Sequence, residues 1–152
     1  NNGWLGVAQI WISGGHITQG TVKVNDTYYN TATYNTPAWR NLVMCQEVGH
    51  TFGLGHQDEN FDNPNLGSCM DYTSNPDTNQ HPNQHDYDQL EAIYAHLDST
   101  TTVGASAANG AGAGQGDSWG RLVAQSRSGH TSVYELRTGA ASSVITFVIW
   151  AS

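Results

Sequence analysis

The stretch from Gln46 to His56 constrains this chain of 152 residues more than any other part of its sequence. On a helix, side chains four positions apart share a face, so Gln46 and His50 would point to one place with Glu47 beside them. Gly53 falls where such a helix must end and reverse, a position that often needs the left-handed backbone that glycine adopts at low cost. His56 could then return to the same place. The spacing predicts a helix, a sharp turn and a cluster of four polar side chains.

This order is close to the H-E-x-x-H pattern, in which two side chains bind zinc and the glutamate acts as general base. The longer pattern H-E-x-x-H-x-x-G-x-x-H, followed by a methionine turn, defines the metzincin zinc endopeptidases. The chain resembles this clan at Glu47, His50, Gly53 and His56, and again at residues 68–72, Ser-Cys-Met-Asp-Tyr. The resemblance implies an α+β, metzincin-like fold with a small twisted β-sheet, an active-site helix, a methionine turn and a C-terminal helix.

The resemblance also implies roles for individual residues. His50 and His56 would bind zinc, and Glu47 would act as general base. Met70 would form an apolar floor below the ligands. Tyr72 matches a tyrosine that astacins and serralysins place near the zinc, where it ligates the metal or donates a hydrogen bond to the oxyanion. A packed aromatic ring under the turn is the alternative for Tyr72.

Gln46 stands where the clan has its first zinc-binding histidine. Its amide oxygen reaches about as far as an imidazole nitrogen, but zinc sites favour imidazole, thiolate and carboxylate. Gln46 is then an unusual ligand, or the site has two protein ligands and a replacement, or it no longer holds zinc; an engineered substitution is a fourth interpretation. Because every other part of the pattern remains, we expect zinc bound by Gln46, His50 and His56.

Two cysteines, Cys45 and Cys69, each precede a residue of this pattern. The resemblance places both beside the floor of the active site, where a disulfide would clamp the turn to the helix. Closing a ring of about 25 residues is worth roughly 3.5 kcal/mol by the loop-entropy relation. Two buried free thiols are the alternative. A disulfide implies an oxidising compartment, and therefore a secreted, extracellular protein.

The charge balance limits the partners. Acidic residues number 13 against 5 basic ones, and the net charge is −8. Nothing in such a chain would hold a phosphate backbone, so we expect no nucleic-acid partner. No apolar run approaches the ~20 residues of a membrane span, so we expect no membrane partner either. Any signal peptide would have been removed or would lie outside this chain, because no basic segment followed by an apolar run begins it.

Periodicity and turn residues predict the other elements. Residues 5–13 and 21–29 are expected to be strands. In metzincins an edge strand before the active-site helix binds substrate as a further strand, and residues 5–10 resemble it; an ordinary sheet strand is the alternative. Thr36 and Pro37 favour the start of a helix running to about residue 52. Its side chains expected to face the sheet are Leu42, Val43, Val48 and Phe52.

The later chain predicts one more helix and three strands. Asn83 and Asp86 resemble a capping arrangement, followed by a helix of about four turns. Residues 1–98 would form the metzincin-like catalytic domain, with an N-terminal part about half as long as usual. Residues 99–116 have the composition of a flexible linker, and 117–152 form a β-rich C-terminal extension. Its strands, at 122–125, 132–136 and 143–150, are expected to dock on the main body and supply sheet; a small exosite module is the alternative.

The loop of residues 58–65 is rich in carboxylates and amides. Clustered oxygen ligands suit calcium, although the spacing matches no defined calcium loop, and a solvated surface loop is the alternative. Asp58, two residues past His56, could instead orient a zinc ligand through a hydrogen bond.

These features together predict a secreted zinc-dependent endopeptidase that hydrolyses peptide bonds through a metal-activated water. Its partner would be a protein or peptide substrate. Glu47 would transfer the protons, and zinc would be the cofactor, with calcium considered as a second ion. The alternative is a pseudoprotease, an extracellular peptide- or protein-binding module that keeps the groove but lacks a working metal site.

Overall fold

A computed structural model describes residues 3–97 and 118–151, which form an α+β fold as predicted. The elements are β1 (Trp4–Ser13), β2 (His16–Val24), α1 (Asp26–Tyr29), α2 (Pro37–Thr51), the 3-10 turn η1 (Pro76–Thr78), α3 (Gln84–Ile93), β3 (Arg121–Gln125), β4 (Thr131–Gly139) and β5 (Ser142–Trp150). The strands make one antiparallel sheet in the order β2-β1-β5-β4-β3.

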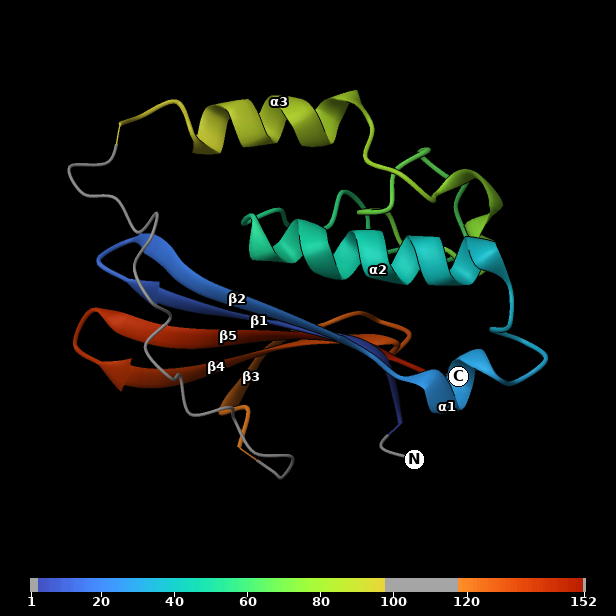
Figure 1. Ribbon diagram of the computed structural model, residues 1–152, viewed down its shortest axis with the longest axis horizontal. Helices are drawn as coiled ribbons and strands as arrows, with labels where there is room; N and C mark the ends of the chain where they lie inside the picture. Colours follow the sequence, from blue (N-terminus) through green and yellow to red (C-terminus); the bar gives the residue numbers. More distant parts are fainter. Residues whose placement is uncertain (1–2, 98–117, 152) are drawn as a thin grey trace.

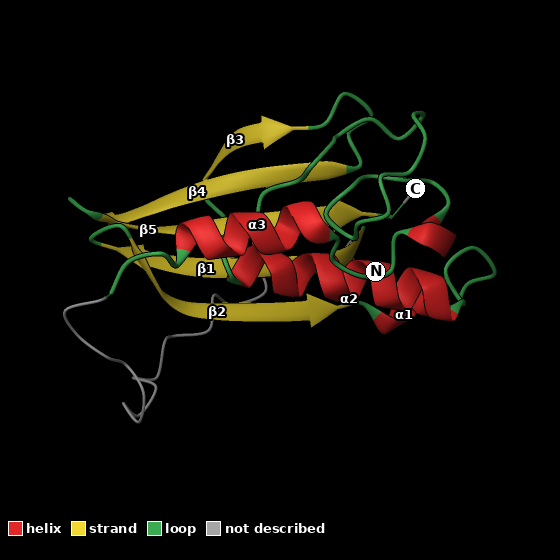
Figure 2. Ribbon diagram, turned by 90° about the horizontal axis from the view of Figure 1, so that it is seen from above, coloured by secondary structure: helices red, strands yellow, loops and turns green. Residues whose placement is uncertain are grey.

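Helices α2 and α3 lie on the same side of this sheet, with α2 next to the strands and α3 farther out (Figure 1). Seen from above, α2 runs along the strands rather than across them (Figure 2). Apolar side chains fill the space on both sides of α2. One cluster, between α2 and the sheet, is built around Leu5, Tyr29 and Val43. The other, between α2 and the chain beyond it, contains Leu42 and Met70.

The first hairpin confirms the predicted strand at residues 5–13 and corrects the second one. Gly14 and Gly15 both have positive φ and make the turn between β1 and β2. The second strand was predicted to reach residue 29, but β2 ends at Val24. Asn25 then caps the short helix α1 by accepting a hydrogen bond from the Thr27 amide, which diverts the chain from the sheet.

The two long helices begin where the sequence predicts. Thr36 caps α2 and Pro37 occupies its first turn. Asn83 and Asp86 form a capping box at the start of α3, which ends at Ile93, one turn earlier than expected. The face of α2 that meets the sheet differs from the prediction, because Val48 and Phe52 are 38% and 50% exposed.

The three C-terminal strands join the main sheet, which confirms that they dock on the body of the protein. Strand β5 pairs with β1 along its length, from Trp4 opposite Trp150 to Ser13 opposite Ser142. Strand β1 is therefore internal in the described sheet, and the expectation of a free edge at residues 5–10 is wrong. The predicted linker, residues 99–116, lies outside the described residues. No described helix has the length and apolarity that crossing a bilayer requires.

Candidate functional site

Helix α2 carries three polar side chains into the interior. Gln46, Glu47 and His50 are 2%, 0% and 0% exposed. Their spacing puts them on the side of the helix that faces the sheet, in the position that apolar residues normally occupy. Helix α2 therefore buries all three residues of the predicted zinc-binding motif that it carries.

The turn after α2 brings the fourth residue back to this group. Phe52 ends the helix and Gly53 follows with a φ of 91°, which confirms the left-handed turn expected of this glycine. The His56 ring then lies against the His50 ring, with 4.6 Å between centroids and 88° between planes. We call Gln46, Glu47, His50 and His56 the buried polar cluster.

The cluster concentrates unpaired polar atoms. Gln46 Nε2, both carboxylate oxygens of Glu47, His50 Nε2 and His56 Nε2 are buried without a hydrogen-bond partner, five of the eight such side-chain atoms among the described residues. Most buried polar atoms in folded proteins are paired, and exceptions usually have a catalytic, ionic or solvent explanation. A bound ion or ligand among these side chains would satisfy several of them at once.

The other ring nitrogen of each histidine is held in place. His50 Nδ1 lies 2.8 Å from the Leu54 carbonyl oxygen, which can only accept, so Nδ1 carries the proton and Nε2 keeps a free lone pair. His56 Nδ1 lies 2.9 Å from the Tyr72 hydroxyl. Metal-binding histidines are typically oriented through their second nitrogen in this way.

Burial sets the protonation states of the cluster. It lowers the pKa of His50 to about 4, against a smaller opposing effect of the Leu54 carbonyl. Burial, and then the neighbouring His50, hold the pKa of His56 well below its usual value. Burial also raises the pKa of Glu47 well above its ordinary range, although the backbone of Ala8 opposes this. Without a cation, the cluster is a set of neutral groups.

Two glycines allow the cluster to be packed this tightly. A Cβ on Gly6 of β1 would lie 2.6 Å from both Glu47 Oε1 and Val43 Cγ1. On the opposite side of α2, a Cβ on Gly49 would lie 2.5 Å from Met70 Sδ. Such contacts are far inside van der Waals distance, so α2 can approach both β1 and the Met70 turn only because these residues are glycine. Neither had been singled out from the sequence.

The Met70 turn is fixed beneath the helix from two directions. Cys45 and Cys69 form the predicted disulfide, with 5.9 Å between their Cα atoms. The Ser68 hydroxyl donates to Asp86, at the start of α3, and accepts from the Met70 amide. Met70 itself is fully buried and packs with Leu42, Leu54 and Cys69; its role as a floor below zinc ligands stays a prediction.

Two of these side chains, His50 and His56, are of a kind that zinc binds. Two neutral imidazoles present free Nε2 atoms, and zinc commonly takes three protein ligands in catalytic sites. No three His, Cys, Asp or Glu side chains gather as a metal-binding group in the described ranges 3–97 and 118–151. Gln46 is the cluster residue that the sequence pattern places in the position of a third ligand. Turning its amide about the last side-chain bond exchanges the unpaired nitrogen for the oxygen, which is the ligating atom.

Phe147 completes the cluster and was not found from the sequence. Its ring stacks on His50, with 4.1 Å between centroids and 7° between planes. Phe61 stacks in a similar way on Tyr72, and His130 contacts the edge of Phe61. Phe147 lies on β5, ninety-seven residues after His50, and no local motif signals such a distant contact.

The predicted calcium loop is held by its own hydrogen bonds. The Asp58 carboxylate accepts from the Asn60 amide and from the Asn63 side chain, each at 2.6 Å. Among the described residues, no recorded hydrogen bond joins Asp58 to His56. The carboxylate nearby is that of Glu59, whose Oε1 lies 3.7 Å from His56 Nδ1. Calcium binding by residues 58–65 stays a prediction.

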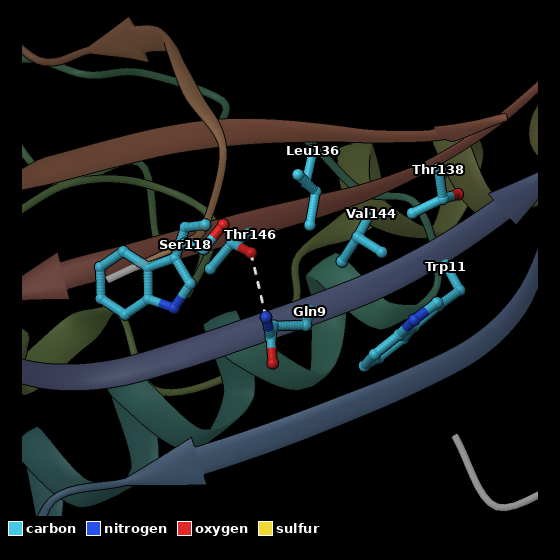
Figure 3. A pocket seen from close by; sticks show the side chains of 8 residues that line it. Gln9, Trp11, Ser118, Leu136, Thr138, Val144 and Thr146 are labelled. Atoms are coloured by element: carbon cyan, nitrogen blue, oxygen red, sulfur yellow. Dashed lines mark hydrogen bonds between the residues drawn. The ribbon is translucent and has the colours of Figure 1, made fainter. Parts of the chain in front are cut away.

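A separate cavity of about 240 Å³ lies away from the cluster. Gln9 and Trp11 of β1 line it, together with Val144 and Thr146 of β5 (Figure 3). Successive side chains of a strand point to opposite faces, and Phe147 points to the helices, so Thr146 points away from them. The cavity therefore belongs to the face of the sheet opposite the cluster.

Comparison of the chain with protein-family models, with curated proteins and with solved structures finds no match.

Proposed function

We propose that this chain is a secreted zinc-dependent endopeptidase of the metzincin type. The observation that carries the proposal is that five buried side-chain atoms of Gln46, Glu47, His50 and His56 have no partner, while the two imidazole rings lie side by side. An ion between the two imidazoles would satisfy both free nitrogens. The sequence pattern, the left-handed turn after α2 and the buried Met70 beneath it support the same assignment.

The side chains have separable roles in such a site. Zinc, when bound, lowers the pKa of a coordinated water to about 7 and polarises the scissile carbonyl. His50, His56 and Gln46 would hold the ion. Glu47 accepts a proton and passes it to the leaving amine, a role worth roughly 10² to 10⁴ in rate. Tyr72, kept neutral because burial raises its pKa, orients His56.

Glu47 suits this role only beside a cation. Burial raises the pKa of its carboxyl, so the group holds its proton in the metal-free cluster. A positive charge within a few ångströms favours the ionised form and lowers the pKa. Metal binding would therefore convert Glu47 from a proton holder to a proton acceptor, which couples the base to the presence of zinc.

The disulfide supports the proposed location. Cys45 and Cys69 are bonded, and structural disulfides persist in oxidising compartments. We accordingly propose an extracellular enzyme whose partner is a protein or peptide.

A pseudoprotease is the second candidate, and Gln46 favours it. A neutral amide is a poor zinc ligand compared with imidazole, so this candidate is a protein that binds peptide without a metal. This candidate predicts peptide binding that chelators do not change and no hydrolysis.

Zinc titration by calorimetry tests the proposal. We expect one zinc per chain in the parent protein, loss of binding in His50→Ala and His56→Ala, and tighter binding in Gln46→His, which restores an imidazole. His85→Ala is the matched control, because His85 lies on α3 with a side chain 54% exposed. Peptide hydrolysis should disappear in Glu47→Ala while zinc still binds. A parent protein that binds no zinc, and gains none from Gln46→His, would contradict the proposal.

A further inference from the structure

The face of the sheet away from the helices carries a second group of side chains with a common chemistry. Gln9 of β1 lies opposite Thr146 of β5, which in turn lies opposite Tyr134 of β4. Directly opposed side chains point to the same side of a sheet, so all three belong to the face opposite the buried polar cluster. The Trp119 ring centroid lies 5.3 Å from that of Tyr134 and 6.0 Å from that of Trp150. Aromatic rings and uncharged polar side chains therefore share this face.

The cavity of about 240 Å³ on this face combines indole rings with buried polar groups. Trp11 and Trp119 both line it, and both are half-buried. Gln9 and Thr146 line it as well, although they are only 6% and 0% exposed (Figure 3). None of the eight described side chains that line the cavity carries a charge. The cavity is therefore aromatic, polar and neutral.

The two buried polar side chains have hydrogen-bonding capacity left over. Gln9 Nε2 donates to Thr146 Oγ1 at 3.2 Å, and this is the one side-chain hydrogen bond recorded for either residue in the described parts of the chain. The Gln9 carbonyl oxygen can still accept a hydrogen bond, and the Thr146 hydroxyl can still donate one. A ligand hydroxyl group matches this pair, because it is a donor and an acceptor at once.

The same properties argue against two other classes of ligand. A charged ligand would lose its hydration in the cavity without meeting an opposite charge, which costs free energy. A wholly apolar ligand would cover the free atoms of Gln9 and Thr146 and leave them unpaired. The volume is below the roughly 300–1,000 Å³ of pockets that hold drug-sized molecules, so it suits a ligand group of about one ring.

We propose that this cavity binds one pyranose ring of a neutral oligosaccharide. The C–H groups of such a ring form an apolar face that packs on an indole, and its hydroxyl groups pair with amide and hydroxyl side chains. Trp11 and Trp119 supply the indoles, and Gln9 and Thr146 supply the hydrogen bonds. The proposal does not depend on the peptidase assignment, because the cavity and the buried polar cluster lie on opposite faces of the sheet.

Titration of the unaltered full chain with neutral oligosaccharides tests the proposal. The panel consists of tetrasaccharides of glucose, xylose, mannose, galactose and N-acetylglucosamine, and we expect saturable binding of at least one by calorimetry and tryptophan fluorescence. A trimer of galacturonate, which is charged, should not bind. N-bromosuccinimide oxidises indoles, and mass spectrometry locates the products. The bound sugar should slow oxidation at Trp11 and Trp119 and leave it unchanged at Trp39, which lies on α2.

Substitutions assign the binding to this cavity. Trp11→Ala removes an indole from its wall and should weaken binding of the selected oligosaccharide at least about tenfold. Trp11→Phe keeps an aromatic ring and should weaken it less. Gln9→Ala removes a hydrogen bond and should weaken binding by about 2- to 10-fold. Gln19→Ala is the matched control, because Gln19 lies opposite Trp11 on the same face but does not line the cavity. Circular dichroism verifies that each variant is folded.

Three results would overturn the proposal. The first is that no member of the panel binds saturably. The second is that indole, the probe for an apolar ligand, binds more tightly than every oligosaccharide. The third is sugar binding that Trp11→Ala and Gln9→Ala leave unchanged, which would place the sugar elsewhere on the molecule. Zinc titrations of these variants should match the parent, so failure of the saccharide site is distinguishable from failure of the peptidase assignment.

Discussion

The two halves of α2 both bury side chains, but the buried side chains differ in chemistry. The first half buries Leu42 and Val43, which are 4% and 0% exposed and belong to the two apolar clusters. The second half buries Gln46, Glu47 and His50 with atoms that have no partner. Burial of apolar surface stabilises the fold, whereas burial of unpaired polar atoms costs free energy. The first half of α2 therefore stabilises the fold, and the second half costs free energy unless a bound ligand pairs its polar atoms.

Removing an apolar side chain from the first half of α2 should change the stability of the protein more than any other substitution considered below. Leu42→Ala leaves a cavity between α2 and the Met70 turn, and we expect the free energy of unfolding to fall by about 2–5 kcal/mol. Urea denaturation measures the loss, and Leu66→Ala is the control because Leu66 is 48% exposed. Zinc affinity, measured under conditions where the variant is folded, should stay within a few-fold of the parent. A large loss of zinc affinity in Leu42→Ala would show that zinc binding in the second half of α2 depends on packing in the first half.

Gly6→Ala should affect both halves at once. The added methyl would lie 2.6 Å from Val43 Cγ1 in the first half and from Glu47 Oε1 in the second. We expect a loss of about 1–3 kcal/mol, typical of overpacking, together with weaker zinc binding because Glu47 must move. Gly55→Ala is the control, since a Cβ there has no neighbour within 4 Å. Equal stability of the two variants would mean that α2 can move away from β1 at little cost.

A polar substitution in the second half of α2 should raise the free energy of unfolding rather than lower it. Glu47→Gln removes an ionisable group that is buried without a partner, and we expect the metal-free protein to gain about 1–3 kcal/mol at pH 7. Glu91→Gln, at an exposed position on α3, should change nothing. Adding zinc should remove the gain, because the ion stabilises the carboxylate of the parent.

The pH dependence follows from the same pKa shifts. The pKa of Glu47 is raised in the folded state, so the unfolded chain releases its proton first, and stability falls as pH rises above 4.5. Glu47→Gln should abolish this decline. The pKa of His50 is lowered to about 4, so the unfolded chain takes up its proton first, and stability falls as pH drops from 6.5 to 4. A decline above pH 4.5 that persists in Glu47→Gln would assign it to another group.

The features of α2 and α3 that depend on neighbouring residues in the chain could be predicted from the sequence. Capping residues indicate the start of both long helices, and Gly53 indicates the turn after α2. The four-residue spacing places Gln46 and His50 on one face of the helix. These features depend on neighbours in the chain. The composition of the buried face was harder: Val48 and Phe52 were expected inside because they are apolar, but the polar cluster takes that side of the helix.

The parts that depend on distant contacts could not be predicted. Strand β5 was expected from its alternation, yet nothing local specifies that it pairs with β1 or that Phe147 stacks on His50. The end of β2 was missed because Asn25 acts as a cap only when the following chain turns away from the sheet. Gly6 likewise acquires its importance only from the closeness of α2.

The smallest predicted change in stability comes from Tyr72→Phe, which tests whether the Tyr72 hydroxyl orients His56 for binding a ligand. Tyr72→Phe removes the hydroxyl that lies 2.9 Å from His56 Nδ1, and one hydrogen bond contributes only about 0.5–1.5 kcal/mol to stability. Zinc affinity should suffer more, by about 10- to 100-fold, because the hydroxyl orients a ligand. Tyr87→Phe, on the exposed side of α3, is the control. If stability and zinc affinity fell in equal measure, Tyr72 would only pack against His56 and Phe61, and His56 would be oriented by the fold alone.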